Sequence, residues 1–171
     1  MLRRIAVLVS AATVLAIVGV CAPAGAADGA PTCAQFAGTS TISPGLTTSN
    51  EFQQIRATGT LSGCSGGGVT SGTFTSHVKG DTSCTPTPGQ QIEGITIVHW
   101  DNGKTSVSKL TLTATANPTV VDVSSSVIGG LFRGDTFVSQ LSFTPTNAGA
   151  NCTSVPVTDV TFQNTQPLTL S

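Results

Sequence analysis

The feature that most constrains this chain is a two-residue alternation of apolar and polar side chains, interrupted at short intervals by turn residues. The alternation is clear in residues 73–78, 137–143 and 160–163. Successive side chains of a β-strand point to opposite faces, so this pattern predicts half-buried strands. No long window shows the 3.6-residue period of an amphipathic helix.

Turn residues divide the chain into short segments of similar length. Antiparallel sandwiches and barrels are typical of many short strands separated by regular turns. The sequence therefore predicts an all-β, disulfide-bonded domain, an antiparallel β-sandwich or barrel of about eight or nine strands. We expect the strands near residues 37–43, 52–62, 72–79, 92–101, 104–116, 119–128, 131–133, 136–144 and 155–163.

One hairpin has a specific turn signal. Asn102-Gly103 between two apolar-rich runs favours a type I′ turn, in which both central residues take positive φ. This turn would pair Val98 with Val107. Beyond Val107 the apolar positions change phase, which predicts a β-bulge near Ser108-Lys109.

The N-terminal segment has the three parts of a secretory signal. Arg3 and Arg4 precede an apolar run over residues 5–20, and Ala24-Gly25-Ala26 follows as a cleavage site. The run is shorter than the roughly 20 residues that span a bilayer. We therefore expect a signal peptide over residues 1–26, a single secreted β domain over 27–171, an extracellular location and no stable membrane anchor after cleavage.

The charge composition of the chain argues against a nucleic-acid partner. The 171-residue chain has 7 basic and 8 acidic side chains, and only 9% of its residues are charged. A protein that binds nucleic acid through phosphates needs a basic surface, so we expect no nucleic-acid partner. No motif predicts a cofactor.

Four cysteines follow the signal: Cys33, Cys64, Cys84 and Cys152. An even number in an exported chain predicts two disulfides, for which three connectivities exist. The cysteines lack the close pairs of a zinc site, so we expect no metal. We predict Cys64–Cys84, across one end of two adjacent strands, and Cys33–Cys152, which would hold the N-terminus.

A set of cysteines and turn residues covers most of the mature chain: Cys33, Ser43-Pro44-Gly45-Leu46, the segment 59–64, Cys84, Trp100 and Gly134. This set resembles small exported β-rich proteins of actinobacteria. The resemblance implies export and a β domain, and it implies no activity.

His99 and Asp101 are the candidate catalytic residues. Two residues apart on one strand, they would project from the same face, where a carboxylate can orient an imidazole. His77 and Asp81 form a second pair of this kind. Both pairs are weak candidates, and we expect a protein that is not an enzyme.

The sequence therefore favours a secreted, non-enzymatic β domain that acts by surface recognition, or as a structural protein, at the cell envelope or outside the cell. Two alternatives remain. One is a carrier of a small apolar ligand, which requires an enclosed apolar cavity. The other is a small secreted hydrolase that uses His99 and Asp101.

Overall fold

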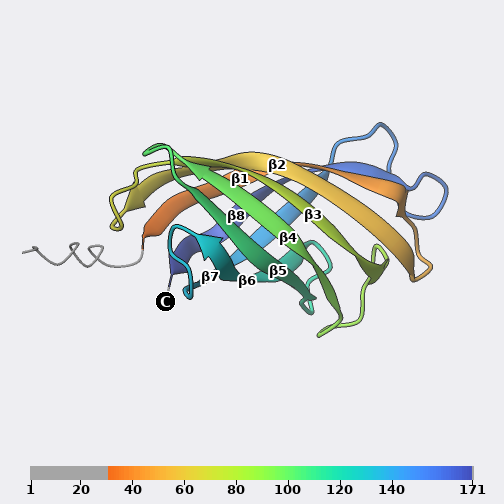
Figure 1. Cartoon of the computed structure of the whole chain (residues 1–171). Helices are drawn as coiled ribbons and strands as arrows, with labels where there is room; N and C mark the ends of the chain where they lie inside the picture. The colour runs from red at the N-terminus through yellow and green to blue at the C-terminus, as the bar shows by residue number, and fades with distance from the viewer. Residues whose placement is uncertain (1–30, 171) are drawn as a thin grey trace, which may run out of the picture.

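A computed structural model describes residues 31–170, and the expected signal peptide lies outside the described residues. Eight antiparallel strands follow one another around a closed barrel, and β1 pairs with β8 to complete it (Figure 1). The prediction of an all-β, disulfide-bonded fold is confirmed, and the choice between sandwich and barrel is settled. The strands are β1 (Thr32–Leu46), β2 (Glu51–Ser65), β3 (Gly72–Thr82), β4 (Gln91–Trp100), β5 (Thr105–Ala114), β6 (Val120–Gly130), β7 (Thr136–Pro145) and β8 (Val157–Leu170).

The predicted strand at 131–133 is wrong, because these residues form the turn between β6 and β7. Phe132 in this turn has a φ of 63°, a left-handed conformation that does not continue a strand. Within residues 31–170 the structure has no helical segment with the length and apolarity that a membrane crossing needs.

The up-and-down order gives the barrel two distinct ends. One end carries the β2–β3, β4–β5 and β6–β7 connections, at residues 66–71, 101–104 and 131–135. The other end carries the remaining four connections, at residues 47–50, 83–90, 115–119 and 146–156. We call the first the sealed end and the second the open end.

The predicted disulfide pairing is wrong. The structure has Cys33–Cys64 at the sealed end and Cys84–Cys152 at the open end. Cys64 lies near the end of β2 and Cys84 just after β3, and two successive antiparallel strands finish at opposite ends of a barrel. The same rule separates Cys33, near the start of β1, from Cys152, which precedes β8.

The β4–β5 hairpin also differs from its prediction. Trp100 and Lys104 pair through a 2.9 Å hydrogen bond, leaving a three-residue loop in which Gly103 has a φ of 78° and Asn102 is not at positive φ. A type I turn followed by a left-handed residue gives this geometry, in place of a type I′ turn. Val98 therefore faces Ser106, one residue away from the predicted partner.

A β-bulge lies next to Ser108 as predicted, but its extra residue belongs to the neighbouring strand β6 and not to β5. The β4–β5 register runs without interruption, and the irregularity lies between β5 and β6, where β6 has an extra residue at Ile128. Ser106 and Ser108 are buried on the inner face of β5, while Val107 lies on the other face. The apolar pattern changed phase because hydroxyl side chains occupy inward positions of this strand.

Candidate functional site

The barrel interior contains a cavity with about 180 Å³ of space for the centres of water-sized molecules. A single water needs roughly 10–15 Å³ on this measure, so the space would hold on the order of ten waters or one small organic molecule. Several inward-facing side chains are only partly buried because they border this space, and they mark its position. These are Phe36, Ile55, Ala57, Leu112, Val121 and Phe143.

Small side chains at one level of the barrel make the cavity possible. Ser40 pairs with Ala57, Ala57 with Ser76, Ser76 with Thr96, and Thr96 with Ser108, so strands β1 to β5 each contribute one small residue. Eight strands enclose an interior that side chains can just fill, so a level of small residues leaves it hollow.

The hydroxyl groups at this level form what we call the hydroxyl row, which consists of Ser40, Ser76, Thr96, Ser108 and Ser125. Ser76 and Thr96 share a hydrogen bond of 2.7 Å between their oxygens, and Ser125 donates to Ser108 over 2.7 Å. All five residues line the cavity, and the rest of its lining is apolar apart from Thr82, Ser83 and Gln90, which lie at the open end.

Three phenylalanine rings form the floor of the cavity on the side of the sealed end. The Phe36 ring lies 4.9 Å from that of Phe74 and 5.9 Å from that of Phe162, both edge-on. Glycines beneath the rings make room for them: a Cβ on Gly59 would lie 2.7 Å from the Phe74 ring, and one on Gly38 would lie 2.8 Å from Phe162. A Cβ at either glycine would also overlap a backbone carbonyl oxygen of the neighbouring strand, that of Thr58 or Ala37, so only glycine fits beneath these rings.

Trp100 closes the barrel beyond this floor. Its indole is 3% exposed, stacks on Phe137 and meets Phe132 edge-on, with centroid distances of 6.2 and 5.4 Å. The indole Nε1–H donates to Ser106 over 2.8 Å, and the Ser106 hydroxyl donates to the carbonyl of Leu131 over 2.6 Å. The buried polar atoms of the Trp are thereby paired, and the sealed end is a packed core.

The open end leads into the cavity. The part of the cavity nearest the open end is lined by residues from the end of β1 and from the β3–β4 and β5–β6 connections. These residues are Leu46, Cys84, Pro86 and Pro118. These residues are apolar but lack the interlocked aromatic rings of the sealed end, so the cavity reaches the loops here.

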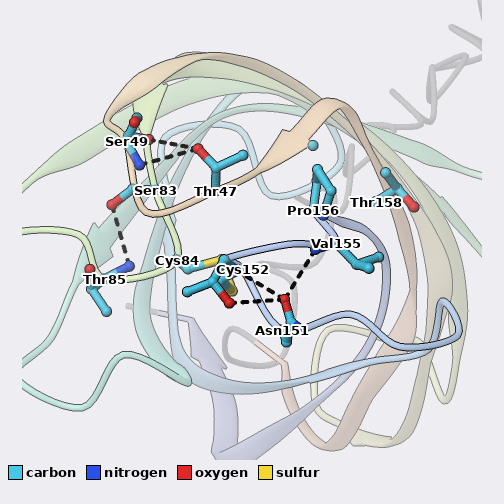
Figure 2. The surroundings of a disulfide bond; sticks show 12 residues. Thr47, Ser49, Ser83, Cys84, Thr85, Asn151, Cys152, Val155, Pro156 and Thr158 are labelled. Carbon is cyan, nitrogen blue, oxygen red and sulfur yellow. Dashed lines mark hydrogen bonds between the residues drawn. A yellow bond between two sulfur atoms is a disulfide. The ribbon is translucent and has the colours of Figure 1, made fainter.

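The Cys84–Cys152 disulfide joins two loops of the open end. Figure 2 shows it with Thr47 and Ser83 on one side and Asn151 and Val155 on the other. The Cys84 N–H donates to the carbonyl of Thr47 over 2.8 Å, which ties the β1–β2 loop to the same cross-link. The Asn151 side chain accepts N–H bonds from residues 153, 154 and 155, which orders the loop that carries Cys152.

The candidate catalytic residues lie outside the barrel and do not interact. Asp101 is in the loop rather than on β4, and its carboxylate accepts hydrogen bonds from Thr70 and Ser71. The hydrogen bond from the Thr70 hydroxyl, followed by those from backbone N–H groups, lowers the pKa of Asp101 below its usual value of 3.8. His99 Nδ1 instead shares a 3.2 Å hydrogen bond with the Thr105 hydroxyl.

The second candidate pair is likewise on the outer surface. His77 and Asp81 are exposed residues of β3, and His99 pairs with Thr73, four positions along that strand from His77. In the described part of the chain, no three His, Cys, Asp or Glu side chains come together as a metal site would require.

Fold and site together define a class: an eight-stranded up-and-down β-barrel with an apolar cavity that one packed end closes and the other end leaves accessible. Comparisons with protein-family models, characterised proteins and solved structures found no match. The molecule's own geometry therefore carries the functional argument.

Sequence reasoning missed the residues that shape this cavity. Ser76 appeared in the alternating pattern between Phe74 and Val78, on the apolar side of the strand. A hydroxyl residue at an inward position on several strands in succession is the signal that could have indicated a hollow interior. That signal becomes readable only with the strand register, which aligns Ser76 with Thr96 and Ser108.

Proposed function

We propose that this protein binds a small apolar molecule inside the barrel, which enters through the open end. The observation that carries the proposal is the apolar cavity, closed on one side by Trp100 and the phenylalanine floor and reaching the loops on the other. Apolar cavities with a few polar groups are the usual form of small-molecule sites. Of the functions considered from the sequence, this supports the carrier.

The cost of an empty cavity supports the proposal further. Side chains that border empty space lose the dispersion contacts of a close-packed core. Ala57, Ser76 and Ser108 could each be larger without changing the strand pattern, and the barrel would then fill. Binding a ligand would restore the missing contacts.

The other two functions have less support. The exposed large apolar side chains Phe52, Ile95, Ile128 and Val138 lie on four different strands, which does not favour a single recognition patch. Surface recognition at the cell envelope stays a prediction from composition. A hydrolase has less support because Asp101 is bonded to Thr70 and Ser71 and does not orient His99.

A neutral fluorescent probe, N-phenylnaphthylamine, tests the proposal. We expect saturable binding with enhanced probe emission, and energy transfer from Trp100, the single Trp of the chain. Ala57→Phe places a ring inside the cavity and should abolish saturable binding. Its matched control is Thr58→Phe, which adds the same ring to the exposed outer face of β2 and should leave binding unchanged.

Folding of the variants is checked independently of the cavity. Trp100 lies in the sealed end, so an unchanged Trp emission spectrum shows that the barrel remains closed there. If Ala57→Phe disturbs this spectrum, the smaller Ala57→Leu takes its place. A parent protein that gives no saturable probe binding, or an equal response of the inner and outer variants, would refute the proposal.

A further inference from the structure

The hydroxyl row has hydrogen-bonding capacity that the protein itself does not use. A hydroxyl offers one donor and two acceptor positions. When two hydroxyls share one hydrogen bond, one of their two O–H groups donates in that bond and the other remains available to a further acceptor. This applies to the pair Ser76–Thr96 and to the pair Ser108–Ser125. Each pair can therefore donate to a further oxygen inside the cavity.

Ser40 points to the same conclusion. It is 5% exposed, and its hydroxyl makes no side-chain hydrogen bond within residues 31–170. Yet no fully buried side-chain polar atom in the described chain lacks a partner. The Ser40 hydroxyl therefore borders open cavity space, where a guest molecule can bond to it.

The cavity offers nothing to a charged group. Its lining in the described chain contains no Asp, Glu, His, Lys or Arg. Moving an ionised carboxylate or ammonium into such surroundings without a partner costs several kcal/mol. A neutral oxygen loses much less hydration free energy on entering the cavity, and the hydroxyls of the row can form hydrogen bonds with it.

We propose that the ligand is an uncharged, largely apolar molecule with a single hydroxyl or carbonyl oxygen, and that the hydroxyl row receives this oxygen. The inference rests on the proposed binding function and specifies its ligand class. The Ser76–Thr96 pair forms the centre of the contact, because it lies on adjacent strands in the middle of the row. The apolar remainder of the ligand lies against the phenylalanine floor and the aliphatic side chains of the wall.

Competition with the bound probe tests this class directly. Decanol and decanoate share one carbon chain and differ in charge at neutral pH. We expect decanol to displace N-phenylnaphthylamine at concentrations lower than decanoate by more than about tenfold, because the ionised carboxylate must lose its water.

A double variant tests the contact itself. Ser76→Ala with Thr96→Val removes both members of one hydrogen-bonded pair, so neither is left buried without a partner. Decanol should bind this variant roughly two- to tenfold more weakly, while the probe, which does not depend on the row, keeps its affinity. Thr75→Val, on the exposed face of the same strand, is the matched control and should change neither value.

The outcomes separate the two proposals. If the parent protein does not bind the probe, the binding function itself fails. If the probe binds but decanoate competes as well as decanol, or decanol does not compete, the ligand class is wrong and the binding function stands. If the double variant binds decanol as tightly as the parent does, the hydroxyl row does not receive the ligand oxygen, and the inference is overturned.

Discussion

The two ends of this barrel are built from the same eight strands but differ in what fills them. At the sealed end, Trp100, Phe132 and Phe137 interlock, and the buried Cys33–Cys64 disulfide lies beside them. At the open end, the Cys84–Cys152 disulfide joins loops and its cysteines are only half-buried. The order of the strands forms the barrel. The size of the inward-facing side chains then decides which end is a packed core and which end leads into the cavity.

The loops at the two ends also differ in how they are held together. Asp101 and Asn102 reach across to the β2–β3 loop, where they bond Thr70, Ser71 and Gly68. This cross-bonding keeps short loops packed over the aromatic rings. At the open end, the two longest loops, residues 83–90 and 146–156, are joined by a disulfide, and the Gln90 amide donates to Asn50 of the β1–β2 loop. We therefore expect the two ends to respond differently to the same perturbation.

The largest expected difference concerns apolar packing. Trp100→Ala removes a nearly fully buried ring and should lower the free energy of unfolding by about 3–5 kcal/mol. Leu46→Ala, at the half-buried rim of the open end, should cost about 1 kcal/mol. Urea unfolding followed by circular dichroism measures both. Equal losses would show that the open end is packed as tightly as the sealed one.

The second-largest difference between the two ends should appear when the disulfides are reduced. Thiol exchange needs access to a sulfur, and Cys33 is 0% exposed and Cys64 8%, whereas Cys84 and Cys152 are half-buried. Mild reductant should open Cys84–Cys152 first and lower stability by about 2–4 kcal/mol. Alkylation followed by peptide mass mapping identifies the opened pair. Alkylation of Cys33 or Cys64 before Cys84 would contradict this order.

The strands were predictable because alternation is a local property. Eight of the nine expected strands exist, since each carries its own period and its own turns. Barrel closure was not predictable, because the β1–β8 pairing joins the first and last strands of the described residues, which are far apart in sequence, and leaves no local pattern. The disulfide connectivity was not predictable for the same reason, because the sequence does not show which strand ends lie next to each other in the barrel.

The cavity was unpredictable for a more specific reason. Sequence reasoning assigns apolar residues to the inside, yet Ile95 and Ile97 point outward while Thr96 points inward. Val107 lies outside and Ser108 inside in the same way. The hollow interior reverses the usual assignment at this level of the two strands, where the inner face carries the hydroxyls of Thr96 and Ser108, although Val98 and Leu110 beside them point inward as expected.

A smaller effect tests the backbone of the sealed-end loops. Gly103 has a φ of 78°, where a Cβ is strained, so Gly103→Val should cost about 1–2 kcal/mol although nothing lies within 4 Å of the added Cβ. Gly129 also has open space around it but lacks a positive φ. Gly129→Val is therefore the matched control and should change stability by less than about 0.5 kcal/mol. Thermal melting of both variants measures the difference, and equal melting temperatures would contradict the turn geometry.

The smallest expected effect is a pH dependence confined to the sealed end. The Thr70 hydroxyl, then the backbone N–H groups of Thr70 and Ser71, lower the pKa of Asp101 in the folded protein below the usual value of 3.8. A lowered folded pKa contributes stability that is present above 3.8 and is lost as the pH falls through the folded value. Between about pH 5 and about pH 3, the urea midpoint should therefore fall more for the parent than for Asp101→Asn.

The position of Asp101 makes this loss specific to one end. Protonation weakens the bonds between the β4–β5 and β2–β3 loops, next to Trp100, so Trp emission should shift with the same pH dependence in the parent. Asp122→Asn removes an exposed carboxylate of β6 instead and controls for the loss of one charge. It should keep the pH dependence of the parent. If Asp101→Asn keeps that dependence as well, the carboxylate does not hold the loops of the sealed end together.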